Sequence, residues 1–339
     1  MPVGRKRETK RNDKIRKKKT GKNNGKGDKK MNPSPLRYPG GKHRITEYIE
    51  KLVLLNECRT FIEPFCGGAS VALSLLLDRA VDRIILNDYD YGIYAFWKSA
   101  IFSTEALTDM IRKTDVTIDE WNRQKAIREG AHRSELEAGF ATFFLNRTNR
   151  SGILEKAGPI GGRAQNGKYL IDCRFNKERL IRQIERIAQY RDRITVLNRD
   201  AVYLVNEDII RLPESFTFFD PPYFEKGKSL YSCFYRKEDH ARLAEAVLGS
   251  MKDMKWIITY DNAEEIRNLY RSADSIEFSL QYTLQKKRIA DEIMFLSDGL
   301  IRPQDEDGCL NIVSRRMHIE PCTIINHWPS KGISERKRH

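Results

Sequence analysis

The sequence predicts an α/β protein whose mainly parallel sheet is interrupted by a mainly helical insertion. From Ser34 onward, short β-rich runs alternate with stretches of helical spacing, which is typical of βαβ units. The stretch from about 111 to 190 breaks this alternation, because it is rich in Arg, Lys, Glu and Gln and contains a glycine-rich patch. A chain of 339 residues is long enough for one large α/β domain that carries an inserted domain.

The expected elements follow from the position and spacing of the apolar residues. We expect strands at 60–64, 83–87, 193–197, 216–219, 256–260 and 292–296, and helices at 69–77 and 238–251. The sheet domain then comprises 34–110 and 191–300, and the inserted domain comprises 111–190. Residues 301–339 form a C-terminal extension to which the sequence assigns no role.

The composition argues against a membrane protein and against a secreted, disulfide-rich protein. Hydrophobic residues make up 40% of the chain and charged residues 32%, and no apolar run approaches the roughly 18 residues of a membrane span. The first thirty residues lack the apolar stretch of a signal peptide, and the six cysteines are scattered. We therefore expect a cytoplasmic protein in a reducing compartment.

The positive charge is concentrated in two segments. The formal net charge is +14: residues 1–30 contribute +11, residues 111–190 contribute +6, and the remaining residues contribute −3. The opening segment, 1–33, has almost no apolar residue and is expected to be a disordered arm. This distribution indicates a polyanion partner that the arm binds through phosphate groups. A solvated tail that only aids solubility is the alternative.

A strand, a glycine-containing turn and the start of a helix are expected at 61–70, where the sequence is FIEPFCGGAS. A turn without side chains lets a ligand approach the backbone at the carboxyl end of a strand, where α/β sheets usually bind ligands. Asp88 lies 25 residues after Glu63 and just past the next strand, where an acid can accept hydrogen bonds from ribose hydroxyls. A plain tight turn and a helix-capping aspartate are the alternative interpretations.

A second group of residues, Asp220-Pro221-Pro222-Tyr223, follows directly after an expected strand. Proline has no N–H, and it holds the preceding residue in an extended conformation. The Asp220 carboxylate and the Pro221 carbonyl therefore form a corner of two acceptors, which suits a planar amino group with two N–H donors. Tyr223 adds an aromatic face on which a nucleobase can stack. An ordinary strand-ending turn is the alternative.

Together these blocks resemble the Dam-like, D12-class N6-adenine DNA methyltransferases. The resemblance covers most of 34–298, and the joint occurrence of its motifs in one order is highly specific. It rests on RYPGGK at 37–42, the turn at 61–70, Asn87-Asp88, and Asp220-Pro221-Pro222-Tyr223, with the basic segment before the last block. It implies a Rossmann-like S-adenosylmethionine-dependent methyltransferase sheet, with the insertion as the target-recognition domain for double-stranded DNA.

The resemblance also implies a role for each matched residue, with S-adenosylmethionine as methyl donor and no metal. Tyr38 and Lys42 would hold the methionine end of the cofactor, Asp88 its ribose and Asp200 its adenine. Asp220 and Tyr223 would border both the cofactor and the target base. The expected cofactor-binding residues are Tyr38, Lys42, Glu63, Phe65, Gly67, Asp88, Asp200 and Asp220.

Catalysis is accordingly expected at Asp220, Pro221 and Tyr223. The adenine amine is a poor nucleophile because its lone pair is delocalised into the ring. The Asp220 carboxylate and the Pro221 carbonyl are expected to accept one hydrogen bond each from the two N–H groups of the amine. This favours a more tetrahedral nitrogen whose lone pair faces the methyl group, and it stabilises the positive charge that develops on the nitrogen. A stacked base cannot reach this corner, so the target adenine has to be flipped out of the duplex.

The basic insertion is expected to read the DNA. Arg147, Asn149 and Arg150 lie in a stretch that resembles the family's recognition hairpin region, and Arg163 and Lys168 are expected to contact phosphates. This stretch departs from the Dam pattern from Arg150 onward, where the pattern has an aromatic residue, so a GATC target is not implied. For Arg147, pairing with a local carboxylate is the alternative interpretation.

Several alternatives remain at this point. Methylation of the cytosine N4 amine has the same acceptor demand, a DNA-binding protein without turnover is possible on the same fold, and the basic arm does not distinguish RNA from DNA. We expect a monomer, and a cognate restriction enzyme is a candidate partner. Cys66 is expected to be a small packed residue. A zinc site is disfavoured because no short Cys-x-x-Cys pair occurs among Cys309, His318, Cys322 and His327.

Overall fold

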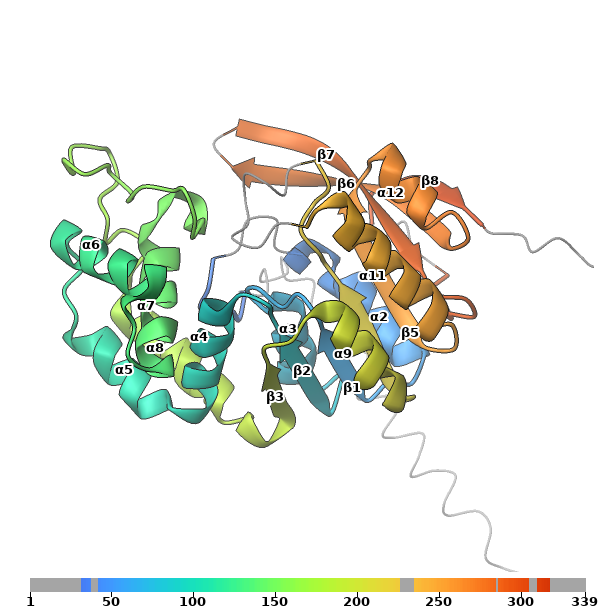
Figure 1. The fold of residues 1–339 in the computed structure, drawn as a ribbon, viewed down its shortest axis with the longest axis horizontal. Helices are drawn as coiled ribbons and strands as arrows, with labels where there is room; N and C mark the ends of the chain where they lie inside the picture. Colours follow the sequence, from blue (N-terminus) through green and yellow to red (C-terminus); the bar gives the residue numbers. More distant parts are fainter. Residues whose placement is uncertain (1–31, 38–41, 226–234, 285, 305–309, 318–339) are drawn as a thin grey trace, which may run out of the picture. The chain divides into compact units, whose positions relative to one another are not determined.

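The computed structural model describes residues 32–37, 42–225, 235–284, 286–304 and 310–317. In this part of the chain the strands form one sheet in the order β3-β2-β1-β4-β5-β7-β6-β8 (Figure 1). The parallel half contains β3 (Ile194–Leu197), β2 (Arg83–Asn87), β1 (Thr60–Glu63), β4 (Ser215–Phe219) and β5 (Lys255–Asp261). The antiparallel half contains β7 (Lys286–Leu296), β6 (Asp274–Leu284) and β8 (Ile312–Arg316).

The order of the parallel strands determines where a ligand can bind. From β1 the chain continues to β2 on one side, and later returns to β4 on the other side of β1. Ligands of open α/β sheets bind at such a reversal of strand order, outside the carboxyl ends of the strands. The segments that follow β1, β2 and β4 therefore meet at one edge of the sheet.

The predicted α/β fold is confirmed, with one addition. The six predicted strands correspond to β1, β2, β3, β4, β5 and β7, and the two predicted helices to α3 (Ser70–Leu77) and α11 (Lys237–Ser250). Strands β6 and β8 were not predicted. Strand β8 lies within the C-terminal extension and pairs with β6, so part of that extension belongs to the sheet.

Helices cover both faces of the sheet, because successive side chains of a strand point to opposite sides. Phe61 of β1 is buried in a core with α2 (Thr46–Leu55), α3 and α4 (Tyr91–Phe102). The next residue, Ile62, is buried in a second core with α9 (Ala201–Glu207), α11 and α12 (Glu264–Leu269). Each such buried side chain stabilises the fold by about 1.5–3 kcal/mol.

The segment between β2 and β3 is helical, as predicted. After α4 it contains α5 (Thr104–Lys113), α6 (Ile118–Ala126), a π-helical turn η3 (Ile127–Ala131), α7 (Glu135–Thr148), the 3-10 turn η4 (Arg150–Gly152) and α8 (Lys177–Ala188). In Figure 1 these helices lie together beside the parallel half of the sheet. The ring of Phe143 in α7 stacks on Phe96 in α4 at 5.5 Å, so the segment shares its buried core with the sheet.

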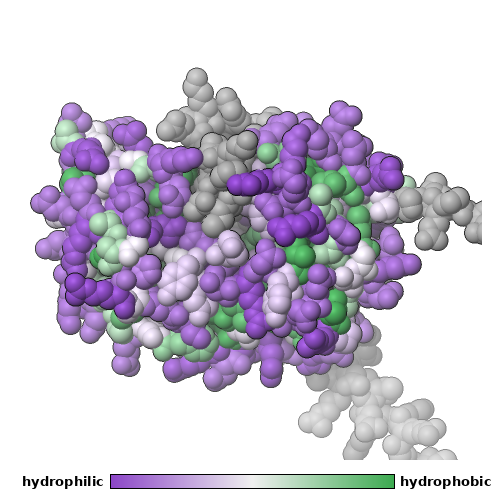
Figure 2. All heavy atoms as spheres, in the orientation of Figure 1, coloured by the Kyte–Doolittle hydropathy of each residue, from purple (hydrophilic) through white to green (hydrophobic). Residues whose placement is uncertain are grey.

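Short 3-10 turns complete the described elements, namely η2 (Lys42–Ile45), η5 (Arg191–Arg193) and η6 (Ile209–Arg211). The face drawn in Figure 2 is largely hydrophilic, with hydrophobic residues in scattered patches. Among the described residues, no helix combines the length and the apolar character that crossing a bilayer requires.

Candidate active site

The turn after β1 is held against the end of β2 by backbone groups. Gly67 has a φ of 43°, in the left-handed region that glycine adopts without steric cost. Its N–H donates to Asp88 Oδ2 at 2.9 Å, and its carbonyl accepts from Trp97 Nε1 at 2.8 Å. The N–H of Cys66 donates to the Asn87 carbonyl at 2.8 Å. The glycine turn and Asp88 thus form one hydrogen-bonded unit.

Two carboxyl groups of this unit have raised pKa values. Burial raises the pKa of Glu63 to about 8, even though its Oε1 accepts a hydrogen bond from the Ala72 N–H, and the negative charge of Asp220 adds to the shift. Burial, together with the nearby charge of Asp90, raises the pKa of Asp88 to about 7. Within the described part of the chain, Glu63 Oε2 is buried without a hydrogen-bond donor. Such an acceptor fits a ligand with an N–H group or positive charge.

Phe65 and Asp200 lie next to this unit, whereas Tyr38 falls outside the described residues. Phe65 is half-buried and makes an edge contact with the Tyr235 ring at 5.5 Å. Asp200 caps α9, because its carboxylate accepts from the Val202 and Tyr203 N–H groups at 3.0 and 3.2 Å. The Asn87 side chain donates to the carbonyl of Arg199, the residue before Asp200, and accepts from the Arg199 N–H. It so joins the cap of α9 to the end of β2.

The buried ammonium group of Lys42 connects the start of the described sheet domain to the segment after β4. Lys42 Nζ donates to Asp220 Oδ1 at 2.7 Å and to the Tyr223 hydroxyl at 2.9 Å. It also lies 3.5 Å from Glu292 Oε2 in β7, and the Tyr223 hydroxyl donates to the other oxygen of Glu292. Lys42 is 3% exposed and Glu292 1%, so the two charges compensate each other in the interior. Lys42 therefore faces protein carboxylates.

Within the described ranges, the Asp220 carboxylate is held through one of its two oxygens. Lys42 and the Thr259 hydroxyl both donate to Oδ1, the latter at 3.0 Å. No donor among the described residues reaches Oδ2, and the side chain is 25% exposed. Among the described residues, one oxygen is thus fixed by two donors and the other is left without one.

The backbone after Asp220 is fixed by a neighbouring strand. Asp261, at the end of β5, is buried and accepts from the N–H groups of Phe224 and Glu225 at 2.9 and 3.0 Å. Pro221 is buried, and Tyr223 is only 7% exposed with its hydroxyl bonded as described above. Little of the Tyr223 ring is therefore open to stack on a base, which differs from the role that the sequence indicated.

The sequence reasoning missed three residues of this corner, Thr259, Asp261 and Glu292. They lie on β5 and β7, and the register pairs Asp261 directly with Glu292. A weak signal was present, because each is a polar residue next to a run of apolar residues that the sequence assigned to a buried strand. Their partners, however, lie on other strands or before the sheet, which local sequence patterns do not reveal.

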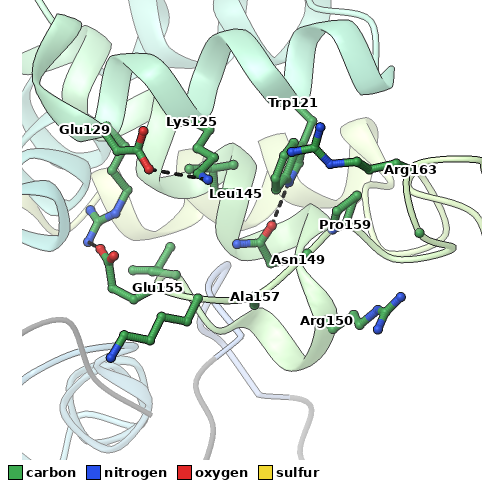
Figure 3. Close-up of a pocket in the computed structure, with 15 residues that line it drawn as sticks. Trp121, Lys125, Glu129, Leu145, Asn149, Arg150, Glu155, Ala157, Pro159 and Arg163 are labelled. Atoms are coloured by element: carbon green, nitrogen blue, oxygen red, sulfur yellow. Dashed lines mark hydrogen bonds and ion pairs between the residues drawn. The ribbon is translucent and has the colours of Figure 1, made fainter. Parts of the chain in front are cut away.

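The helical segment contains a pocket of about 520 Å³ (Figure 3). Its lining is rich in cations, with only two carboxylates. Trp121 forms one wall, with Lys125 Nζ and the Arg163 guanidinium each 5.8 Å from its ring. The lining residues are Trp121, Lys125, Arg128, Glu129, Leu145, Asn149, Arg150, Leu154, Glu155, Lys156, Ala157, Gly158, Pro159, Gly162 and Arg163.

The five residues expected to contact DNA fall into two groups. Arg147 is 7% exposed, and its guanidinium donates to the carbonyls of Arg174 and Pro35, the latter at 3.3 Å. Asn149 is 1% exposed, and its side chain accepts from Trp121 Nε1 at 2.7 Å and donates to the Ile153 carbonyl at 2.8 Å. Both side chains are thus used inside the protein. Exposed side chains belong to Arg150, Arg163 and Lys168.

Burial accounts for the difference at Arg147. Loss of solvent, together with the positive charge of Arg37, lowers the pKa of Arg147 to about 9. The geometry favours a structural role, as the alternative interpretation held, although backbone carbonyls rather than a carboxylate are the partners.

The cysteine and metal predictions have mixed outcomes. Cys66 is buried, and burial raises the pKa of its thiol well above the usual value, so it is a packed residue as predicted. The four residues considered for zinc, Cys309, His318, Cys322 and His327, lie outside the described residues. Within the described ranges, no group of three or more His, Cys, Asp or Glu residues is arranged to hold a metal.

Comparison with known proteins places this arrangement in one family. A sequence model described as "D12 class N6 adenine-specific DNA methyltransferase" matches residues 38–284. This range contains the turn after β1, the acid after β2 and the corner after β4.

Individual relatives are more distant. The chain is 23% identical over 271 residues to the type II methyltransferase M.CviBI of Paramecium bursaria Chlorella virus NC1A, covering 76% of this chain and 95% of that protein. It is 25% identical over 235 residues to the type II methyltransferase M.MjaIII of Methanocaldococcus jannaschii, covering 62% of this chain and 77% of that protein. A solved structure, the rRNA methyltransferase AviRa of Streptomyces viridochromogenes, matches at 14% identity with a TM-score of 0.35, over 77% of this chain and 86% of that one. That structural similarity is too low to support an argument.

Proposed function

Because the chain belongs to the D12 class N6 adenine-specific DNA methyltransferases, we propose that it transfers a methyl group from S-adenosylmethionine to the N6 amine of adenine in DNA. The observation that carries this proposal is the Asp220 carboxylate, with Oδ1 fixed by Lys42 and Thr259 and Oδ2 open among the described residues. An acceptor fixed in this way is what the N6 amine requires.

The residues after β1 and β2 fit S-adenosylmethionine, which supplies an electrophilic methyl group on a sulfonium when bound. The buried Glu63 Oε2, which lacks a donor within the described part of the chain, matches a ligand that is cationic and carries an amino group. The Asp88 carboxylate lies beside the glycine turn, in a position to accept hydrogen bonds from ribose hydroxyls. Phe65 and Asp200 border the same edge and complete the proposed cofactor site.

The role of Lys42 differs from the one that the family resemblance implied. Its ammonium already lies between the carboxylates of Asp220 and Glu292. We assign to it the orientation of Asp220, so that Oδ2 points to the substrate, and we leave the cofactor's carboxylate to other groups. Because Lys42, Glu292 and Tyr223 are buried and mutually bonded, the corner is preorganised before a base enters.

The proposed chemistry uses two acceptors. Asp220 Oδ2 and the Pro221 carbonyl accept the two N–H bonds of the adenine amine, which directs the nitrogen lone pair to the methyl group and stabilises the positive charge that develops. The target base has to leave the duplex to reach this corner, at a cost of a few kcal/mol. Because Tyr223 is largely buried, we assign its ring and hydroxyl to the wall of the corner.

On the DNA side, we assign the contacts to the exposed cations of the helical segment, which we propose as the target-recognition domain. Arg150 and Arg163 line the pocket of Figure 3, and Lys168 follows in the same loop region. Arg150 is the candidate for a base edge, and Arg163 and Lys168 for phosphates. The two relatives are type II methyltransferases, which supports a role of this chain in the modification of DNA. We propose that it acts in the cytoplasm as a monomer, with a cognate restriction enzyme as partner.

The test is transfer of a labelled methyl group to DNA by wild type, Asp220→Ala and a control, Asp82→Ala. Asp82 is a half-exposed aspartate that pairs with Arg59, so its removal changes charge equally without touching the corner. We expect Asp220→Ala to lower kcat about 10²–10³-fold, as loss of a preorganised acceptor does, while Asp82→Ala keeps its activity. Equal rates for Asp220→Ala and wild type would exclude the mechanism. Digestion of the product to nucleosides with mass analysis separates N6-methyladenine from N4-methylcytosine.

A further inference from the structure

One charged contact within the helical segment ties the π-helical turn η3 to Asp90, which lies two residues after Asp88. Arg128, in the π-helical turn η3, reaches the N-terminus of α4, where its guanidinium forms a two-pronged ion pair with Asp90, with N–O distances of 2.7 and 3.3 Å. A third bond, 2.8 Å long, goes to the Thr142 hydroxyl of α7. The side chains of Arg128 and Asp90 are only 10% and 12% exposed. A planar guanidinium in this geometry fixes position as well as charge.

The fold reserves space for this contact. Gly92 lies two residues after Asp90 in α4, and a Cβ there would come within 2.1 Å of Arg128 Nη1 and 2.2 Å of Thr142 Oγ1. Glycine inside a helix costs about 0.5–1 kcal/mol relative to alanine. Here it allows the guanidinium to lie against the helix backbone.

From Asp90, hydrogen bonds continue to the turn after β1. The Asp90 carboxylate caps α4 by accepting from the N–H groups of Gly92 and Ile93. The Asp90 N–H donates to Asp88 Oδ1 at 3.0 Å, and Asp88 Oδ2 accepts from Gly67 at 2.9 Å. Arg128 is therefore linked through Asp90 to Asp88, the proposed ribose acceptor.

The other side of Arg128 borders the pocket of the helical segment. Arg128 is part of the pocket lining, and its guanidinium lies 3.5 Å from the carboxylate of Glu155, a second lining residue whose side chain is 44% exposed. The same guanidinium thus contacts a buried carboxylate on the cofactor side and a half-exposed carboxylate on the pocket side.

We propose that Arg128 is a positioning residue of the methyl-transfer reaction, which clamps Asp90 and so holds Asp88 and the glycine turn in the geometry that binds S-adenosylmethionine. This proposal rests on the proposed function, in which Asp88 holds the cofactor ribose. It makes the helical segment necessary for cofactor binding as well as for DNA binding.

The charges around Asp88 make the role testable by pH. The groups that face Asp88 are Asp90 and Arg128, and the thiol of Cys66 lies across the turn. The pKa of Asp88 is about 7, and the charge of Asp90 raises this pKa whereas the charge of Arg128 lowers it. Because the ionised carboxylate is the better acceptor for two hydroxyls, cofactor affinity in wild type should fall as pH falls through about 7.

Four variants separate positioning from simple charge. Arg128→Gln removes the clamp and a positive charge, so the fall in affinity should move to higher pH. Asp90→Asn keeps the helix cap but removes a negative charge, so the fall should move to lower pH. Arg128→Lys and Gly92→Ala keep the charges and disturb only the geometry, so the pH of the fall should stay. In all four, the affinity at high pH should drop by about fivefold or more.

The measurement is the Kd of S-adenosylmethionine for the full chain by calorimetry as a function of pH, with thermal unfolding to verify folding. Arg123→Gln is the matched control, since Arg123 forms an exposed pair with Glu120 on the neighbouring helix α6 and its loss removes the same charge. We expect the control to match wild type.

The possible outcomes are distinguishable. Unchanged affinity and unchanged pH dependence in Arg128→Gln and Asp90→Asn would overturn the inference while wild type still bound cofactor. Shifts of the same sign in these two variants would also overturn it. If Arg128→Gln does not fold, Asp90→Asn and Gly92→Ala test the inference instead. An affinity for S-adenosylmethionine that is unchanged or higher in both of these variants would contradict the clamp. Failure of wild type to bind S-adenosylmethionine would instead overturn the proposed function.

Discussion

Glu63 and Asp88 illustrate how a binding edge is built from groups that are costly for the fold. Both are carboxyls whose pKa values lie well above the usual range, at about 8 and about 7. Burial is the main cause in both cases, and the nearby charges of Asp220 and Asp90 add to it. A cationic ligand at this edge would compensate these carboxylates, which is a reason for the fold to keep them.

Glu63 should make the protein less stable as pH rises. Its folded pKa of about 8 exceeds the ordinary value of 4.5, so the folded state holds its proton more tightly than the unfolded state does. The stabilisation is complete below about pH 4.5 and is lost as pH rises through about 8. We predict that Glu63→Gln removes this dependence. From low to high pH, the free energy of unfolding of the variant should rise by about 1–3 kcal/mol relative to that of wild type. Urea unfolding of the cofactor-free proteins at both ends of this range measures it, and parallel pH curves would contradict it.

At the scale of elements, helix termini hold several of the acids in place. Asp90 caps α4 and Asp200 caps α9, each through two backbone N–H groups. The proposed cofactor edge is therefore lined by residues that also terminate helices, so structural and binding roles coincide at these positions.

Variants of Asp200 can separate the two roles. Asp200→Ala removes the cap of α9 and should lower the free energy of unfolding by about 1 kcal/mol, whereas Asp200→Asn keeps it, because asparagine caps helices equally well. If Asp200 also contacts the cofactor, Asp200→Asn should raise the KM for S-adenosylmethionine without a change in melting temperature. Thermal unfolding together with steady-state kinetics tests this. Equal melting of Asp200→Ala and wild type would argue against the cap.

The strands of the parallel half, with helices α3 and α11, were predictable because each is encoded locally. Glu63, Asn87 and Asp220 each end or follow an apolar run, and parallel strands bring such positions to one edge. Thr259 and Glu292 could not be found in this way, since the role of Thr259 depends on the pairing of β4 with β5 and that of Glu292 on the pairing of β5 with β7. Arg147 was assigned to DNA for a similar reason: a buried arginine bonded to carbonyls and an exposed one look alike in sequence, and only packing separates them.

At the scale of the whole molecule, charge is distributed so that binding strength and sequence reading are separable. Residues 1–30 carry +11 and the proposed recognition segment carries +6, whereas the remaining residues together carry −3. Interactions with phosphates provide affinity without sequence information, whereas contacts with base edges provide specificity.

Deletion of residues 1–30 should therefore weaken DNA binding and leave the methylated sequence unchanged. The slope of log affinity against log salt should become shallower by about 0.9 for each phosphate that the arm neutralises in the full-length protein. Filter or fluorescence binding at several salt concentrations measures the slope, and sequencing of modified bases measures the target. A changed target sequence in the truncated protein would contradict this division of labour.

The adjacency of β1 and β4 has a consequence for reaction distance. Glu63 ends one strand and Asp220 follows the other, and hydrogen bonds between the two backbones hold neighbouring strands about 4.7–4.9 Å apart. In the proposed reaction, the spacing of these two hydrogen-bonded strands thus sets the distance between the methyl donor and the acceptor. Surface loops and recognition helices can then diverge between relatives, while the pairing of β1 with β4 keeps the two reactants close to each other.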